Sequence, residues 1–491
     1  MQIRRRRTAT MLAVIALAAL AGCASTPAPD AATLLRQADQ TLGAGGLKTL
    51  TFSARGTGAV FGQAWQPGIA WPQASYSSFS RAIDYDNNAM REDYARARAE
   101  PNGGGALPLM GQGEQKVTGF ARDNWAWNAA GQGFAAAPVA LDGRLHDLWT
   151  TPHGAIVAAQ LYGATAGTRS EGGQTYGTVS YKVPGKLEAT MWIDAAGLIT
   201  RIDSRQPSPV LGDTDTVTRY SDYRKVGNIQ FPMRIQQSQG GFPVLDLTVQ
   251  EVQPNAAVDI SVPDNVRGFS ERVAAEKVAD GVWFLGGGSH NSVAIEMSNH
   301  VVLVETPLYD GRSAAVLAEV RKLVPGKPVK TVINSHHHFD HAGGLRTAVA
   351  EGAQLITSQM AKPYFEKVLA NPNTIAPDAL ARSGRKPDII GVDGKRVLID
   401  GNDRIEVYEM QGSVHAQGFM MVYLPKQKLL IEADAYTPGA PNSPPPAVVN
   451  ANNLNLVQNI ERLGLQVERI LPLHSRIATM AELNAAIGRK P

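Results

Sequence analysis

The chain has 491 residues, of which 44% are hydrophobic and 19% charged, so a wholly disordered protein is excluded and two or three domains are expected. The formal net charge is +3, but four of the 47 basic residues lie at positions 4–7, and the remaining 43 basic residues face 44 acidic ones. This balance argues against nucleic acid as a partner, because duplex binding depends on Lys and Arg that neutralise phosphates.

The first 22 residues have the features of an export signal. The arginines at positions 4–7 precede a short apolar stretch over residues 11–20, followed by small residues. Cys23 is the only cysteine, so neither an internal disulfide nor a thiolate zinc cluster can form. Residues 20–23 (LAGC) resemble a bacterial lipobox, which implies a lipoprotein signal peptide over 1–22 and lipidation of Cys23. We expect a lipid anchor in the bacterial cell envelope, facing the periplasm, with the outer membrane favoured; an ordinary signal peptide is the alternative.

The next segments are expected to form a tether and then a β-rich envelope domain. Residues 23–33 lack a periodic apolar face and are predicted as the tether. Residues 34–267 are predicted as a mostly antiparallel β domain, whose role the sequence does not indicate. Alternating apolar and polar residues predict strands at 50–61, 116–129, 175–183 and 187–194, and helices are expected at 34–42 and 146–162.

The pattern changes near residue 268, after which strand-like segments alternate with helical ones. This alternation predicts an α/β layered domain over residues 268–491. The expected strands are at 281–285, 292–297, 300–305 and 329–334, and the expected helices are at 312–324, 453–463 and 480–487.

A cluster of metal-binding residue types follows the buried strand predicted at 329–334. Residues 336–341 (HHHFDH) place four imidazoles and one carboxylate within six positions. Neutral imidazole and carboxylate suit a divalent ion such as zinc. In an extended or loop conformation His336 and His338 point the same way, while Asp340 and His341 reach a neighbouring position. The segment therefore predicts a metal centre; the alternative is a set of unrelated core and surface histidines.

The spacing His336-x-His338-x-Asp340-His341 matches the HxHxDH signature of the metallo-β-lactamase superfamily, which folds as an αββα sandwich. The resemblance covers about residues 277–487 and includes three further segments, GSVHAQGF, LLIEADAY and ILPLHS. It implies two zinc ions. The implied ligands are His336, His338 and His415 for one ion, Asp340, His341 and His474 for the other, and Asp434 as a bridge between them.

Two positions depart from the family pattern. Ser475 stands where glycine commonly follows the last histidine, and Glu305 stands where aspartate is usual. We expect Glu305 only to brace the loops of the site. His337 has no family role and is expected to lie beside the ligands or face the pocket. The segments 371–393 and 437–447 are predicted either to shape a substrate pocket or to be ordinary surface loops.

The resemblance implies a dinuclear zinc hydrolase that uses a metal-bridging hydroxide to cleave a small ester, lactone, thioester or amide, with Asp340 as the catalytic residue that orients the hydroxide and relays its proton. Because β-lactamases of the superfamily usually have Cys or Ser at the bridging position, Asp434 favours the lactonase and glyoxalase-II-like branches. Two alternatives stay open. The same scaffold hosts iron-dependent oxidative enzymes, which the ligand types do not exclude, and the protein could be a non-catalytic envelope binding lipoprotein.

Overall fold

The computed structural model describes residues 30–99, 113–441, 443–444, 446 and 448–489. The predicted signal peptide (1–22) and Cys23 lie outside the described residues. Helix α1 (Ala31–Leu42) begins inside the segment predicted as a tether, because the Asp30 side chain accepts a hydrogen bond from the backbone N–H of Thr33 at 2.7 Å and caps the helix. Residues 31–33 are therefore helical. In the part of the chain described, no helix is both long enough and apolar enough to cross a membrane.

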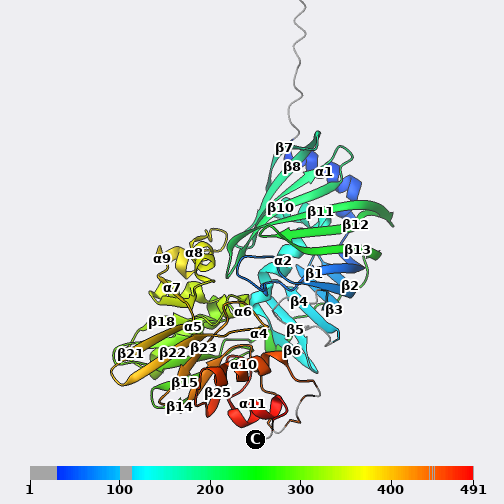
Figure 1. Ribbon diagram of the computed structural model, residues 1–491. Helices are drawn as coiled ribbons and strands as arrows, with labels where there is room; N and C mark the ends of the chain where they lie inside the picture. Colours follow the sequence, from blue (N-terminus) through cyan, green and yellow to red (C-terminus); the bar gives the residue numbers. More distant parts are fainter. Residues whose placement is uncertain (1–29, 100–112, 442, 445, 447, 490–491) are drawn as a thin grey trace, which may run out of the picture.

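The N-terminal part is built on one large antiparallel sheet, which runs in Figure 1 from β7 at the top down the right-hand side to β6. Over the described residues its spatial order is β6-β5-β4-β3-β2-β1-β13-β12-β11-β10-β9-β8-β7, so β1 and β13 pair although they are far apart in sequence. The strands are β1 (Thr49–Ala59), β2 (Gln73–Asp84), β3 (Ala89–Arg98), β4 (Gln115–Arg122), β5 (Trp125–Ala130), β6 (Gly133–Ala136), β7 (Ala164–Glu171), β8 (Gln174–Val183), β9 (Leu187–Ile193), β10 (Ile199–Ser208), β11 (Gly212–Val226), β12 (Ile229–Gln239) and β13 (Phe242–Pro254).

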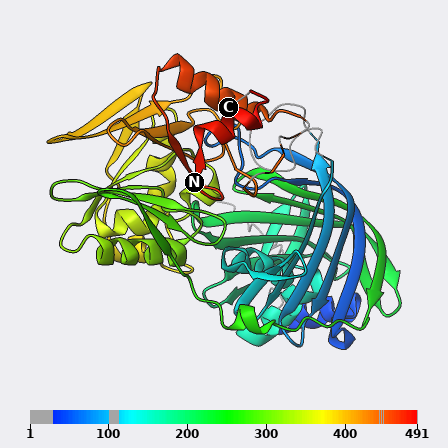
Figure 2. The ribbon, with the colours of Figure 1, turned by 90° about the horizontal axis from the view of Figure 1, so that it is seen from below.

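The sheet curves around helices α1, α2 (Leu141–Trp149) and α3 (Pro152–Tyr162), as Figure 2 shows from below. The apolar residues of these helices and of the inner sheet face form one buried core. Gly177 on β8 permits close contact with α1, because a Cβ atom there would lie 2.6 Å from the Leu34 Cδ2 atom. The mostly antiparallel sheet and a helix at 34–42 were thus predicted correctly, whereas the single helix expected at 146–162 is two helices, α2 and α3, separated at Thr150 and Thr151. The stretch 116–129 is not one strand: it turns at Asp123 (φ +52°) into the hairpin β4–β5.

A buried histidine couples the stability of the β domain to pH. His153 on α3 is 1% exposed, places its Nε2 atom 3.2 Å from the Leu42 carbonyl oxygen and stacks on Phe231. Burial lowers the pKa of His153 to about 4, below its ordinary value. As the pH falls, His153 therefore takes up a proton at a higher pH in the unfolded chain than in the folded one. The free energy of unfolding decreases as the pH drops from above 6.5 toward 4.

We expect this histidine to contribute about 2 kcal/mol to the loss of unfolding free energy between pH 7 and pH 5. The measurement is urea unfolding of wild-type protein and of His153→Gln at both pH values. The variant should lose less stability than the wild type over this interval. Equal losses would contradict the assignment of this pH dependence to His153.

The C-terminal part contains two packed sheets with helices on their outer faces, the αββα sandwich that the sequence predicts (Figure 1). The strands of the seven-stranded sheet, in spatial order within the described chain, are β14 (Ala274–Ala279), β15 (Val282–Gly286), β16 (Ser292–Glu296), β17 (Val301–Val304), β18 (Val329–Ile333), β19 (Gln354–Ser358) and β20 (Ile389–Val392). The strands of the six-stranded sheet, also in spatial order within the described chain, are β21 (Lys395–Asp400), β22 (Asp403–Glu409), β23 (Met420–Leu424), β24 (Leu429–Glu432), β25 (Arg469–Pro472) and β26 (Ala478–Thr479).

Apolar side chains from both sheets form the central core, including Val302 and Ile333 from one sheet and Val407 and Val422 from the other. The helices of this part are α5 (Asp310–Leu323), α6 (Phe339–Ala342), α7 (Leu345–Glu351), α8 (Lys362–Ala370), α9 (Ala379–Ser383), α10 (Ala451–Arg462) and α11 (Met480–Ala486). A second apolar core packs α5, α7 and α8 against the seven-stranded sheet, whereas α10 and α11 pack with the six-stranded one. The short helix α4 (Asp264–Arg267) precedes β14 and contacts β6 through the hydrogen bond from Asn265 Nδ2 to the Phe134 carbonyl oxygen. The domain division near residue 268 stays a prediction.

Candidate metal centre

The predicted ligands follow the ends of strands at one edge of the sandwich. The segment 336–341 comes directly after β18 and enters helix α6. Strands β24 and β25 pair in parallel, so Asp434 and His474, which follow them, lie at the same edge of their sheet. His415 lies in the connection between β22 and β23. The fold therefore brings together four segments that are distant in sequence.

Three histidines form the first group of the site. The Nε2 atom of His415 lies 3.2 Å from His336 Nε2 and 3.0 Å from His338 Nδ1. All three side chains are buried, and their ligand atoms lie within 4.8 Å of one another. Three converging imidazole nitrogens are a donor set typical of a bound divalent metal ion.

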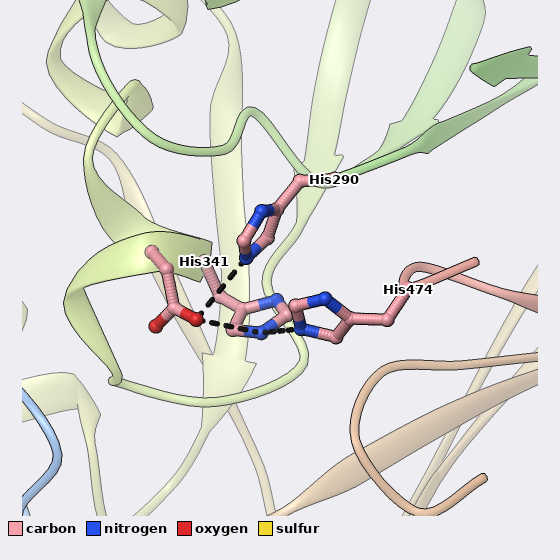
Figure 3. Close-up of side chains that lie close together, drawn as sticks. His290, His341 and His474 are labelled. Carbon is pink, nitrogen blue, oxygen red and sulfur yellow. Dashed lines mark hydrogen bonds and ion pairs between the residues drawn. The ribbon is translucent and has the colours of Figure 1, made fainter. Parts of the chain in front are cut away.

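The second group contains the predicted residues Asp340, His341 and His474 and one further residue, His290. Asp340 Oδ2 lies 3.1 Å from His290 Nε2 and 3.7 Å from His341 Nε2, and the Nε2 atoms of His341 and His474 are 3.0 Å apart. Figure 3 shows His290, His341 and His474 converging from separate backbone segments. The Asp340 side chain keeps 27% of its surface exposed, so this group is open to small molecules.

Asp434 lies between the two groups. Its Oδ2 atom is 2.8 Å from His341 Nε2 and 3.5 Å from both His336 Nε2 and His415 Nε2. Its Oδ1 atom is 3.1 Å from His474 Nε2. The Oδ2 atom is buried, and it lies among imidazole nitrogens of both groups. A buried carboxylate oxygen surrounded by imidazole nitrogens fits a position that bridges two cations.

Backbone carbonyls fix the tautomers of two ligand histidines. His338 Nε2 lies 3.0 Å from the Ala64 carbonyl oxygen, and His474 Nδ1 lies 3.2 Å from the Ser289 carbonyl oxygen. A carbonyl only accepts, so each of these nitrogens carries the hydrogen. The opposite nitrogens, His338 Nδ1 and His474 Nε2, are left with free lone pairs, and both face the centre of the site.

Glu305 fixes the tautomers of two other ligand histidines, His336 and His341, through a short network of hydrogen bonds. Its Oε2 atom lies 2.6 Å from His341 Nδ1, and its Oε1 atom accepts hydrogen bonds from the backbone N–H and the hydroxyl of Ser335. Because the Ser335 hydroxyl donates to Glu305, its oxygen accepts from His336 Nδ1 at 2.9 Å. The Nε2 atoms of His336 and His341 thus face the metal centre, in the arrangement seen when outer residues orient metal ligands.

Sequence comparison agrees with this geometry. The model of the metallo-β-lactamase superfamily matches residues 285–464, which span the segments carrying six of the seven predicted ligands. The C-terminal region belongs to the metallo-β-lactamase superfamily. Its members are generally metal-dependent hydrolases, and the His/Asp cluster of this metallo-β-lactamase domain fits a divalent metal.

One curated relative and several solved structures are also similar to part of this chain. The 2,4-dinitroanisole O-demethylase subunit alpha of Nocardioides sp. (strain JS1661) is 26% identical over 184 residues, which are 37% of this chain and 52% of that protein, so the match spans about half the length of the relative. Among solved structures, a metallo-β-lactamase from Pontibacter korlensis is 17% identical with a TM-score of 0.34 and covers 44% of this chain and 98% of its own. The metallo-β-lactamase FIM-1 from Pseudomonas aeruginosa in its mono-zinc form is 16% identical with a TM-score of 0.33 and covers 45% and 95%.

The electrostatics of the metallo-β-lactamase domain favour positive charge at the centre. Burial lowers the pKa of His336 and His338 well below the ordinary value, so both are neutral and can act as ligands. Burial alone would raise the pKa of the Asp340 and Asp434 carboxyls, but neighbouring histidines lower both. Burial likewise opposes the charged form of His341, yet the surrounding carboxylates raise its pKa well above the ordinary value. Buried carboxylates therefore create a site that a cation neutralises.

The structure settles where the remaining predicted residues lie. Glu305 accepts hydrogen bonds from Ser335, but it also contacts the predicted ligand His341, so it does more than brace the loops. Ser475 adopts a left-handed conformation (φ +70°), which explains why glycine is common at this position, and its hydroxyl donates to the Pro438 carbonyl oxygen at 2.8 Å. His337 lies beside the ligands, with Nε2 2.9 Å from the Ala64 carbonyl oxygen.

The two segments with undecided roles lie in different places. Residues near the start of 371–393 dock on the β domain, where Asn371 Nδ2 donates to the Leu211 carbonyl oxygen and the Asp213 N–H donates to the Pro372 carbonyl oxygen, both at 2.8 Å. The start of 437–447 lies beside the segment that carries His474, through the hydrogen bond from Ser475 to Pro438. The first segment therefore joins the two parts of the chain, and the second flanks the metal centre.

Sequence reasoning missed His290 and the residues around Ala64. His290 is 5% exposed and follows a run of glycines, which the sequence presents only as a turn. Ala64 lies in the segment between β1 and β2 of the β domain, and nothing in its composition indicates proximity to a metal centre. For His290 the available signal was a histidine in the turn between two predicted strands of the same domain as the ligands.

Proposed function

We propose that the protein is a dinuclear zinc hydrolase that cleaves a small ester, lactone, thioester or amide. The observation that carries this proposal is the position of Asp434, whose Oδ2 atom lies 2.8 Å from His341 Nε2 of the second group and 3.5 Å from both His336 Nε2 and His415 Nε2 of the first. A single-metal site would not need a carboxylate between two sets of ligand atoms. Zinc is favoured because imidazole and carboxylate ligands match its preferences.

Seven side chains would bind the metal ions, and one of them, Asp340, would also transfer a proton. Bound divalent ions would lower the pKa of a water molecule and polarise the scissile carbonyl. His336, His338 and His415 would hold one ion, Asp340, His341 and His474 the other, with Asp434 between them. Asp340, whose partly exposed carboxylate keeps free acceptor capacity, would orient the attacking water, accept its proton and deliver it to the leaving group.

A cavity lies next to the loop that carries His415, and none of the predicted metal ligands lines it. It has a volume of about 470 Å³ and lies along residues 409–413 and 416–418, on both sides of His415. Trp65 of the β domain and Met360 contribute apolar walls, and Asp393 and Gln411 contribute polar ones. A few polar groups in a mostly preformed pocket are typical of small-molecule sites.

Elemental analysis of the protein purified without residues 1–23 tests the metal assignment. About two zinc ions per chain would support the proposal. One iron ion would instead favour the oxidative enzyme, because this ligand set also suits iron. No retained metal after reconstitution with zinc would contradict a metal-dependent reaction at this site.

A substrate panel then tests the reaction class. We would compare 4-nitrophenyl acetate, an acyl-homoserine lactone, an acyl thioester and a β-lactam with 2,4-dinitroanisole. The last compound is included because of the relative from Nocardioides, whose name describes O-demethylation of it. Turnover of the ether alone would replace acyl hydrolysis with ether cleavage as the reaction at this centre.

We also propose that the protein is anchored to the bacterial envelope through lipidated Cys23, facing the periplasm. Cys23→Ser should move the protein from the membrane fraction to the soluble fraction, because serine lacks the thiol that would carry the lipid anchor. Fractionation of cells that express wild type and variant, followed by immunoblotting, measures the change. Membrane association of the variant equal to that of the wild type would contradict lipidation at Cys23.

A further inference from the structure

The segment that connects β1 and β2 of the β domain, residues 60–72, lies directly against the metal centre. From this segment the Gln63 Nε2 atom donates to Asp340 Oδ1 at 2.8 Å. The Ala64 carbonyl oxygen accepts from His338 Nε2 at 3.0 Å and from His337 Nε2 at 2.9 Å. A residue of each predicted metal group is thus held by the β domain.

Backbone hydrogen bonds fix this segment on both sides of the site. The Phe339 N–H donates to the Gly62 carbonyl oxygen at 3.2 Å, and the Gln417 N–H donates to the Trp65 carbonyl oxygen at 2.9 Å. The first bond lies within the ligand segment 336–341, and the second lies two residues after His415. The β1–β2 segment therefore bridges the two loops that supply the first group of histidines.

Aromatic packing holds the segment close to helix α6. The Phe61 ring meets Phe339 edge-on with centroids 5.2 Å apart, and Trp71 meets Phe339 with centroids 6.1 Å apart. Gly62 has φ +79°, and a Cβ atom there would lie 2.6 Å from the Phe339 ring, so only glycine permits this approach. Gln63 is 8% exposed. These contacts fix the position from which Gln63 reaches Asp340.

We propose that Gln63 is a positioning residue of the metal centre and that the β domain forms one wall of the active site. This inference rests on the proposed function. A hydrogen bond from an amide to a carboxylate is directional and charge-assisted, so it restricts rotation of the Asp340 side chain. With Oδ1 bound to Gln63, Oδ2 is directed toward His290, His341 and the second metal position.

The chain offers a matched control in the same segment. Gln66 also crosses between the two parts of the chain, but its Nε2 atom donates to Gln417 Oε1 at 2.5 Å, and Gln417 is not a predicted ligand. Gln63→Met and Gln66→Met each remove one amide of similar size and one hydrogen bond between the parts. A purely structural role for Gln63 would give both variants the same properties.

Zinc affinity and the absorption spectrum of the cobalt(II)-substituted protein are the measurements, and neither requires a known substrate. We expect Gln63→Met to bind the second zinc ion about 10-fold more weakly and to alter the cobalt d–d bands, as outer-residue changes do in other metal sites. Gln66→Met should match the wild type in both. Thermal unfolding should give similar Tm values for the two variants.

The outcomes separate this inference from the proposed function. If the wild type binds two metal ions and Gln63→Met behaves as Gln66→Met does, Gln63 has no positioning role, although the hydrolase proposal stands. If the wild type binds no zinc or cobalt, the proposed function fails and this inference fails with it. If Gln63→Met unfolds at lower temperature than Gln66→Met, Gln63→Asn serves as a second variant, and wild-type zinc affinity with wild-type cobalt bands in that variant would overturn the inference.

Discussion

Asp340→Asn is expected to lower kcat by at least about 100-fold while the protein stays folded. Asparagine has nearly the shape of aspartate, so packing around helix α6 should be retained. It lacks the charge that His341 and His290 stabilise, and it cannot accept a proton from the attacking water or pass one to the leaving group. The measurement is steady-state kinetics on the best substrate of the panel, with both proteins loaded to the same zinc content.

Asp388→Asn is a suitable control for this experiment. Asp388 lies in the same domain and accepts a hydrogen bond from Gln354 Nε2 at the surface, so its replacement should leave kcat unchanged. Circular dichroism would confirm that both variants are folded. Near wild-type turnover by Asp340→Asn at full zinc content would show that this carboxylate is only a ligand and would contradict its proposed role in proton transfer.

The sequence was sufficient to predict which residues come together at this site, because most of them lie in one short segment or at strand ends. His336 to His341 occupy six consecutive positions, so their proximity does not depend on tertiary structure. Asp434 and His474 each follow an apolar run, and parallel pairing of β24 with β25 brings them to one edge. Local pattern and family resemblance therefore agree with the final geometry.

The β domain shows what local pattern cannot provide. Alternation of apolar and polar residues identified strands such as β8 and β9, whose pairing partners are neighbours in sequence. It could not predict that β1 pairs with β13, because Leu50 and Pro254 are about 200 residues apart and nothing local specifies the pairing. That pairing joins strands β1–β6 to strands β7–β13 in one sheet.

The contact between the two parts was beyond prediction for a related reason. Gln63 and Asp340 are 277 positions apart, and a single glutamine in a loop carries no periodicity or motif. The need for glycine at position 62 and the packing of Phe61 on Phe339 can be recognised only when the structures of the β1–β2 segment and of helix α6 are both known. Residues that orient ligands through tertiary contacts are therefore the part of a metal site that one sequence reveals least.

Glu305→Gln is expected to weaken zinc binding by about 100-fold, at the upper end of effects seen for residues that orient metal ligands. The Glu305 carboxylate is fully buried and accepts from His341 Nδ1 on one oxygen and from Ser335 on the other. Glutamine keeps the volume but turns one acceptor into a donor, so an N–H group must face another donor. It also removes a negative charge that favours a cation at His341. Zinc affinity measured by competition with a chromophoric chelator gives the change.

Two further variants decide between orientation of a ligand and simple bracing of loops by Glu305. Glu296→Gln, in the same domain, removes only the ion pair between Glu296 and Lys327 and should leave zinc affinity unchanged. Glu305→Asp keeps a carboxylate and should bind zinc more tightly than Glu305→Gln, even if the shorter side chain lowers the Tm equally. If zinc affinity instead follows the Tm across the three variants, Glu305 acts through the stability of the loops. If affinity follows the presence of the carboxylate, the hydrogen bond to His341 sets the strength of metal binding.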